Sequence, residues 1–278
     1  MKVLIISGSH PRHEYILRDV ITQHSQVQFK IIFMQRESLF PDFPVKDRHP
    51  SAAQRKLFSH HFNLREQLES EHYGSKDLSA YEHLPHVSLT KITPDQLNEN
   101  TVHKSIQSFG ANACIVMGAG MLTNETLDLL PEETFNIHLG LSPKYRGSAT
   151  LFWPTYFMDP FSTGITFHRI NLQPDAGDIL HQTLPVFKRN LTLHETAIAS
   201  VKAGKRDLGR LFDRLLEKSN LVSEPQPIVG KTFLTTDFRI SHLELIYNLF
   251  DDQVLDALWP NDSVLPLPRL RTPNLVDQ

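Results

Sequence analysis

Short apolar runs alternate with amphipathic segments along most of the chain. KVLIIS, residues 2–7, is a nearly continuous apolar run that ends at a Gly-Ser turn, and ACIVMG, residues 113–118, is a second. Such runs are typical of strands that are buried on both faces of a parallel sheet. The segments 27–34, 87–92 and 135–139 predict further strands.

Helical spacing of apolar residues predicts the elements between these strands. Residues 13–25 place Tyr15, Ile16 and Val20 on one face, and further helices are predicted over 54–74, 93–110 and 123–130, with Thr123 as the N-cap of the last. Residues 192–219 predict a long amphipathic helix, whose apolar positions are Leu208, Leu211, Phe212, Leu215 and Leu216.

The order of these elements predicts the fold class. Residues 162–170 and 179–187 alternate weakly and predict an antiparallel pair late in the chain. We therefore expect an α/β protein with a Rossmann-like, mostly parallel sheet flanked by helices. Residues 1–218 form the expected main domain, and 219–278 a small extension of short strands, one helix and a Pro-rich tail.

Composition excludes several classes of protein. Hydrophobic residues make up 40% and charged residues 21% of the 278 residues, which is ordinary for a globular protein. No window approaches the roughly 18 apolar residues of a membrane span, and the N-terminal apolar run is too short for a signal peptide. The formal net charge is −3 without a basic stripe, which argues against a nucleic-acid partner.

Cysteine and histidine usage adds two expectations. Cys114 is the only cysteine and lies in an apolar run, which indicates a buried structural thiol in a cytoplasmic protein. Histidines are numerous, but neither His10 and His13 nor His60 and His61 are joined by a carboxylate or a cysteine at ligand spacing. We therefore predict no metal site.

The stretch FNIHLGLSPKYRG, residues 135–147, is the first sign of chemistry. Residues two apart in a strand share a face, so Asn136 and His138 point the same way, close to a strand end. Ligands of open α/β sheets bind beyond the carboxyl ends of strands. There an Asn amide can donate to a developing oxyanion, and a His can move a proton near neutral pH. Asp175, in the later segment QPDAGDIL, could supply the carboxylate that orients the His, with Asp178 close behind.

With these segments the chain resembles the formyltransferase family that uses 10-formyltetrahydrofolate. The N-I-H triplet, the PKYRG turn and GITFHRINLQPDAGDIL carry the resemblance, which covers Met1 to about Leu216 and is strongest from Ala113 to Leu180. It implies the formyltransferase fold, a one-carbon transferase activity and three catalytic residues, Asn136, His138 and Asp175. The family's usual N-x-H-x-S-L-L-P has Ser where this chain has Gly140, a departure that bears on substrate fit.

The resemblance also implies where the donor binds. In the family, the pterin ring lies between the backbone after the strand at 113–117 and the loop that carries the D-x-G motif. The residues expected to bind the donor are Met117, Gly118, Ala119, Gly120, Met121, Leu172, Gln173 and Pro174. Small residues at 118–120 would let a flat ring approach the backbone.

The loop SGSHPRH after the first strand has three open interpretations. Exposed amides at a helix N-terminus favour anions, and Arg12 could add a bidentate contact to a phosphate. A plain turn and a metal site are the alternatives. The residues expected to bind the acceptor are Ser9, His10, Arg12, Tyr145, Arg146, Gly147 and His168; His168 could equally be structural.

The acceptor stays open between members of the family. Only about sixty residues follow the long helix, which is too few for the β-barrel of methionyl-tRNA formyltransferases, and the chain starts directly with a strand, unlike the hydrolase. We therefore expect a small-molecule amine, first a nucleotide-linked amino sugar and second glycinamide ribonucleotide. A 10-formyltetrahydrofolate hydrolase and a non-catalytic folate-binding module remain alternatives. The sequence leaves a homodimer open.

Overall fold

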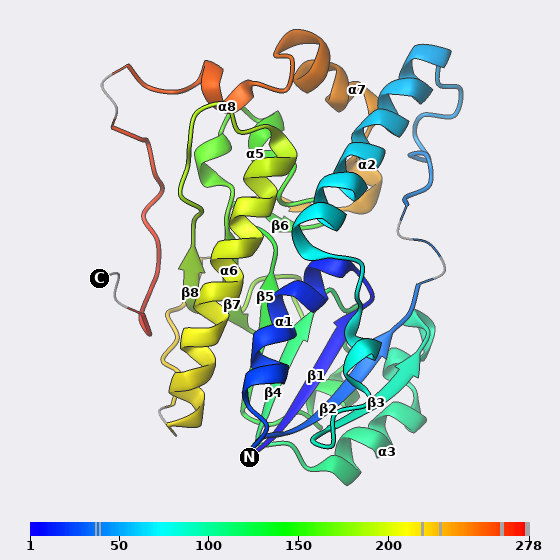
Figure 1. Ribbon diagram of the computed structural model, residues 1–278, viewed down its shortest axis with the longest axis vertical. Coiled ribbons are helices and arrows are strands. Elements are labelled where there is room, and N and C mark those ends of the chain that lie inside the picture. The colour runs from blue at the N-terminus through cyan, green and yellow to red at the C-terminus, as the bar shows by residue number, and fades with distance from the viewer. Residues whose placement is uncertain (37, 39, 218–219, 228–229, 262–263, 276–278) are drawn as a thin grey trace.

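The computed structural model describes residues 1–36, 38, 40–217, 220–227, 230–261 and 264–275 (Figure 1). The strands are β1 (Lys2–Gly8), β2 (Gln28–Met34), β3 (Val87–Ile92), β4 (Ala113–Met117), β5 (Glu133–His138), β6 (Arg146–Gly147), β7 (Ile165–Arg169), β8 (Ile179–Thr183) and β9 (Thr232–Phe233). The α-helices are α1 (Pro11–Gln23), α2 (Ala52–Tyr73), α3 (Asn100–Phe109), α4 (Asn124–Leu127), α5 (Trp153–Tyr156), α6 (Leu193–Leu216), α7 (Ile240–Glu244) and α8 (Val254–Ala257). Shorter turns are the 3-10 helices η1 (Leu78–Tyr81), η2 (Pro94–Asn98), η3 (Pro160–Ser162) and η4 (Thr235–Asp237), and the π-helical turn η5 (Leu245–Leu249).

One seven-stranded sheet, in the order β3-β2-β1-β4-β5-β7-β8, forms the centre of the molecule. The strands from β3 to β5 pair in parallel, whereas β5 with β7 and β7 with β8 pair antiparallel. The predicted α/β class and the late antiparallel pair are both confirmed. β6 and β9 form a separate two-stranded ladder.

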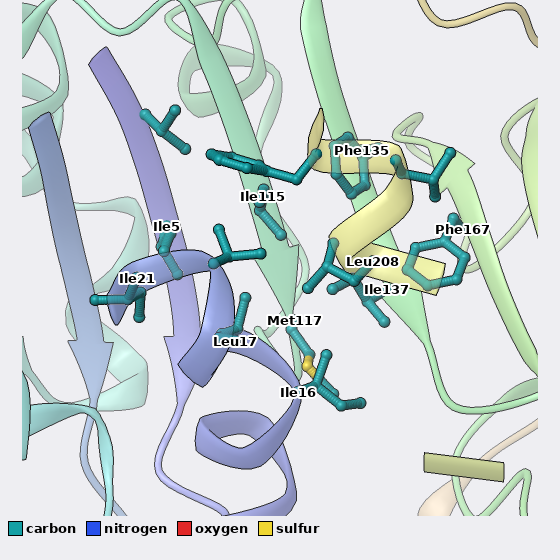
Figure 2. Packing of buried hydrophobic residues seen from close by; sticks show 14 of the residues in the cluster. Ile5, Ile16, Leu17, Ile21, Ile115, Met117, Phe135, Ile137, Phe167 and Leu208 are labelled. Atoms are coloured by element: carbon teal, nitrogen blue, oxygen red, sulfur yellow. The ribbon is translucent and has the colours of Figure 1, made fainter. Parts of the chain in front are cut away.

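Both faces of the sheet are covered, and strand β1 shows how. Val3 and Ile5 belong to the same cluster as the apolar residues of α1 and α6, and Figure 2 shows Ile5 beside the side chains of α1. Leu4 and Ile6 instead pack in a cluster with those of α3. Side chains alternate across a strand, so an apolar run is required where helices lie on both sides. Burying each such aliphatic side chain contributes roughly 1.5–3 kcal/mol.

Helix ends follow the capping residues in the sequence. Thr123 caps α4 by accepting from the backbone N–H of Thr126, as predicted. The Thr192 side chain forms a capping box with Glu195 at the start of α6. The single helix predicted over 93–110 is wrong, because Glu99 is extended (φ −84°, ψ 157°) and divides it into η2 and α3.

The chain after α6 returns to the edge of the sheet. Residues 264–275 run along the outer side of β8, where the backbone N–H of Gln182 donates to the carbonyl of Arg271 at 2.9 Å (Figure 1). Cys114 lies buried in β4, as predicted, and its burial raises the pKa of the thiol. Among the helices of the described residues, none has the length and apolar character needed to cross a membrane.

Candidate active site

Three elements bring four polar side chains together at one end of the sheet. Asn136 and His138 lie on the same face of β5, and His168 lies opposite Asn136 on β7. Asp175 comes from the loop that joins β7 to β8. We call these four residues the β5–β7 site. They include Asn136, His138 and Asp175, the three side chains that the resemblance selects. The prediction that Asn136 and His138 share a face is confirmed.

The Asp175 carboxylate is the centre of this group. Its Oδ1 lies 3.2 Å from His138 Nδ1, 3.4 Å from His168 Nε2 and 3.4 Å from Asn136 Nδ2. Its Oδ2 accepts a hydrogen bond of 2.8 Å from the backbone N–H of Gly147. One carboxylate thus faces two imidazoles and an amide while a backbone donor holds its other oxygen.

The hydrogen bonds of His138 decide where a proton can lie. Its Nε2 is 2.8 Å from the carbonyl oxygen of Tyr145, and a carbonyl can only accept, so Nε2 carries a hydrogen. The contact between Nδ1 and Asp175 is then a hydrogen bond only when a second proton lies between those two atoms. The pair can therefore take up or release one proton without moving.

His168 has the opposite tautomer. Its Nδ1 donates to the carbonyl of Arg169 at 2.7 Å, so the Nε2 of the neutral ring accepts from Asn136 Nδ2 at 3.1 Å. A proton added at Nε2 would instead point to Asp175, 3.4 Å away. Asn136 therefore links His168 to the carboxylate.

Burial and charge oppose each other in this group. Burial lowers the pKa of His138 below its usual value, although Asp175 counteracts part of that shift. Burial alone would raise the pKa of Asp175, but His138, His168 and the Gly147 N–H lower it below its usual range. The carboxylate is ionised at neutral pH. The second proton of His138, between Nδ1 and Asp175, is weakly held because the pKa of the imidazole is lowered.

The D-A-G turn has a tightly constrained backbone. Asp175 adopts a left-handed conformation (φ 50°), which Asp tolerates better than most residues. A Cβ at Gly177 would lie 1.8 Å from the carbonyl oxygen of Arg169, so no larger residue fits there. The glycine lets the turn lie directly on β7 and thereby brings Asp175 to His138.

Gly140 lies against the imidazole of His138. A Cβ at this position would lie 2.5 Å from His138 Nε2 and 2.6 Å from the Cβ of Thr150. A Ser at this position would require His138 or Thr150 to move. The sequence interpretation linked this departure to substrate fit, whereas in the structure it bears on the packing of His138.

The turn that ends at Gly147 contributes backbone atoms to the site. The Tyr145 hydroxyl donates to Asp159 at 2.8 Å, and Arg146 is only 4% exposed, so both predicted acceptor-binding side chains are buried. Gly147 has φ 91°, and a Cβ there would lie 2.1 Å from the carbonyl oxygen of Phe233 in β9. Because Gly147 has no side chain, β9 can pack directly against it, and this places the backbone N–H of Gly147 at Asp175.

Two exposed apolar side chains lie in the segments expected to bind the donor. Met121 is 55% and Leu172 is 54% exposed, while Ala119 and Ile170, on the same two segments, pack on one shared hydrophobic cluster. We expected the small residue Gly118 to let a flat ring approach the backbone. The space beside it is instead filled by His13, because a Cβ at Gly118 would lie 2.1 Å from Cε1 of that ring.

The loop after β1 forms a second polar group, called here the β1–α1 cluster: His10, Arg12, His13 and Glu69. Arg12 pairs with Glu69 of α2 at 2.6 Å, and His10 Nδ1 lies 3.4 Å from the same carboxylate. His13 faces the carbonyl of Gly8 at 3.0 Å, and its burial lowers its pKa to about 4. Ser9 accepts from the backbone N–H of Arg36 at 3.2 Å.

Sequence reasoning missed the partners that have no motif. Glu69 lies in a helix with a charged face, and Gln226, which donates to the backbone of the D-A-G turn, lies in a Pro-rich segment. Neither segment carries a signal that could have identified them. Within the described part of the chain, no three His, Cys, Asp or Glu side chains are grouped to hold a metal ion.

Curated sequences similar to this chain are methionyl-tRNA formyltransferases. The protein of Clostridioides difficile is 29% identical over 153 residues, which cover 52% of this chain and 48% of that protein. The protein of Koribacter versatilis is 28% identical over 174 residues, or 59% of this chain and 55% of that protein. The chain thus spans about half the length of these curated relatives.

Solved structures with the same fold come from sugar and ribonucleotide enzymes. An N-formyltransferase from Helicobacter canadensis, in complex with folinic acid and dTDP-3-aminofucose, aligns over 86% of this chain and 73% of its own (TM-score 0.55, 17% identity). A formyltransferase from Anoxybacillus kamchatkensis, in complex with a UDP-linked formamido sugar and tetrahydrofolate, aligns over 92% and 97% (TM-score 0.51, 15% identity). Phosphoribosylglycinamide formyltransferase from Anaplasma phagocytophilum aligns over 84% and 97% (TM-score 0.53, 15% identity).

The match to a whole family is more extensive than the pairwise sequence matches. The family model described as Formyl transferase matches residues 1–205. That range includes strands β1 to β8 and the complete β5–β7 site. Since the match extends over more than half of the sequence, this chain belongs to the formyl transferase family.

Proposed function

We propose that this protein transfers the formyl group of 10-formyltetrahydrofolate to a primary amine of a small molecule. The observation that supports this most is the convergence of Asn136, His138 and Asp175. The Asp175 carboxylate lies 3.2 Å from the imidazole of His138 and 3.4 Å from the amide of Asn136, at the carboxyl end of β5. A protein that only bound folate would have no need of this arrangement.

The donor fits the side of the site formed by the segments that follow β4 and β7. Met121 and Leu172 are exposed apolar side chains on these two segments, and an apolar ring surface could pack on them. A Cβ at Gly120 would meet only Leu97 of η2, at 3.6 Å, so the backbone there is open to close approach. The donor supplies the formyl group when bound, and the residues proposed to hold it are Met117, Gly118, Ala119, Gly120, Met121, Leu172, Gln173 and Pro174.

The polar side chains would stabilise charge and move a proton. As the amine attacks, negative charge grows on the formyl oxygen, and the Asn136 amide can donate to it. A protonated His138 would stabilise the same charge, and its Nε2–H could donate directly only by leaving the carbonyl of Tyr145. In this structure Asn136 donates to Asp175 and His168, so the formyl oxygen would replace one of these acceptors. The Asp175 carboxylate would hold the proton on His138 and, through water, pass the proton of the amine to the donor nitrogen as the bond between that nitrogen and the formyl carbon breaks.

A nucleotide-linked amino sugar is the acceptor we propose. Two proteins with the same fold bind nucleotide-linked sugars together with a folate. The β1–α1 cluster lies at the same edge of the sheet and holds Arg12, the proposed contact for a phosphate, with Ser9, His10 and Gly147 proposed along the acceptor path. Glycinamide ribonucleotide is the second candidate, since the chain aligns with 97% of an enzyme named for that substrate.

One assay separates these activities. The protein is incubated with 10-formyltetrahydrofolate, with and without dTDP- or UDP-linked amino sugars or glycinamide ribonucleotide, and free tetrahydrofolate is measured. We expect release that depends on an amino sugar. Release without any amine would identify a hydrolase, and no release with any acceptor would contradict the proposed activity.

A further inference from the structure

The segment that follows α6 contacts the turn that carries Asp175. Gln226 lies in this segment and is 8% exposed. Its Nε2 donates to the carbonyl of Asp175 at 2.9 Å and to the carbonyl of Gly177 at 2.6 Å. Both oxygens can only accept, so the nitrogen of the amide must face them. One side chain from outside the turn therefore ties its two ends together.

The turn depends on such a contact because few of its own bonds hold it. Asp175 has a left-handed backbone, a sparsely populated conformation that the surroundings must maintain. Within the turn, the backbone N–H of Ala176 donates to Gln173 at 3.3 Å, which is a long hydrogen bond. The two donors of Gln226 act on the residues either side of Ala176.

The segment that carries Gln226 is itself anchored to the sheet. Glu224 and Ile179 exchange backbone hydrogen bonds of 2.8 and 2.9 Å, which adds a bridge beside β8. The buried side chain of Asn274 donates to the carbonyls of Leu180 and Val222 at 2.8 and 2.7 Å. The C-terminal stretch of chain beside β8 in Figure 1 thus fixes the segment in place.

We infer that Gln226 is a positioning residue for Asp175. The inference rests on the proposed function, because Asp175 is the carboxylate of that reaction. Gln226 does not touch the reacting atoms; it fixes the backbone from which the carboxylate reaches His138 Nδ1 at 3.2 Å. The residues after α6 therefore complete a site whose other side chains come from β5, β7 and the loop after β7.

Loss of the two donors should affect turnover more than binding. Without them the turn relaxes and the carboxylate moves away from His138. The proton on His138 is then less stabilised, and the pKa of the imidazole falls further. A small displacement of a catalytic group is enough to reduce turnover strongly.

The test compares Gln226→Met with Glu224→Ala in the full chain. Methionine keeps the length of the side chain but has no donor, whereas the exposed Glu224 side chain belongs to the same segment and its backbone bridge stays. We expect Gln226→Met to lower kcat about 10- to 100-fold with KM changed less than about 3-fold. Glu224→Ala should match the wild type. Wild-type kcat in Gln226→Met would overturn the inference.

A second readout does not require turnover. The ¹⁵N chemical shifts of His138 are followed against pH without substrates, and the titration of Gln226→Met should move to lower pH than that of the wild type. An unchanged titration would overturn the inference even if activity is lost. A wild-type protein without formyl transfer would instead contradict the proposed function, while this titration still tests Gln226.

Gln226→Glu is a second variant that tests the inference if Gln226→Met does not fold. An ionised carboxylate has no donor and repels both carbonyl oxygens, whereas the protonated acid keeps one donor. We expect kcat to be low at neutral pH and to recover in part toward acid pH relative to the wild type. A ratio of variant to wild-type kcat near one at every pH would contradict the positioning role.

Discussion

Two polar groups lie at the carboxyl edge of the same sheet, and their charges are balanced in different ways. In the β5–β7 site, the Asp175 carboxylate faces two imidazoles and an amide. In the β1–α1 cluster, the Glu69 carboxylate pairs with Arg12, whose charge is permanent. A proton can move within the first group, whereas the ion pair of the second has no proton to exchange near neutral pH.

Burial lowers the pKa of histidines in both groups, but the neighbouring charges differ. Asp175 opposes part of the effect of burial on His138, although the pKa of the imidazole stays below its usual value. His13 lies beside the carbonyl of Gly8 and near arginines, and burial lowers its pKa to about 4. A carboxylate beside the ring thus favours the protonated form of His138, whereas arginines near His13 disfavour it.

The largest effect is expected for Asp175→Asn, which keeps the shape and removes the charge. The pKa of His138 should fall further, and turnover should drop by about 10²- to 10⁴-fold with little change in thermal stability. The acid limb of the remaining activity should shift to lower pH. The measurement is kcat against pH.

Asp178→Asn is the control for this substitution. Asp178 is exposed, and its backbone carbonyl, not its side chain, accepts from the N–H of Arg169. Loss of activity in this variant with activity spared in Asp175→Asn would mean that the motif was aligned to the wrong aspartate.

Asn136→Ala should lower kcat by about 10²- to 10³-fold, because it removes a donor to the developing negative charge. His138→Ala should lower it by at least about 10²-fold. Binding of tetrahydrofolate, measured by calorimetry, should stay close to that of the wild type in both variants. Near-normal turnover in either would remove the central assignment.

The dependence of the unfolding free energy on acid pH tests the β1–α1 cluster. His13 has a pKa of about 4 in the folded chain and about 6.5 when unfolded. The folded state therefore binds fewer protons between these values, and stability is lost as pH falls from 6.5 toward 4. The loss from this residue is about 3 kcal/mol. Denaturant unfolding of His13→Gln should show a shallower dependence on pH over that window; an equal dependence would contradict the burial argument.

The smallest effect is expected at the ion pair of the β1–α1 cluster. If the loop holds a phosphate of the acceptor, Arg12→Ala should raise the acceptor's KM about 10-fold with kcat nearly unchanged. Glu69→Gln should act in the opposite direction, because it frees the guanidinium. An unchanged KM for a phosphorylated acceptor in both variants would leave the loop with a structural role only.

The order of residues alone specifies the framework and the main side chains of the site. Apolar runs predict β1 and β4 because a strand covered on both faces needs apolar residues at every position. The period of two in N-I-H places Asn136 and His138 on one face. Asp175 is identified by its motif and lies where the motif implies, 3.2 Å from His138.

The groups that complete the site depend on tertiary contacts. The carbonyl of Tyr145 and the N–H of Gly147 fix His138 and Asp175, but nearly every residue has these atoms, so sequence cannot single them out. Gln226 and Glu69 reach their partners across long separations in the chain, through the packing of whole segments. Local patterns specify strands and the faces of side chains, whereas contacts between distant segments depend on how those segments pack.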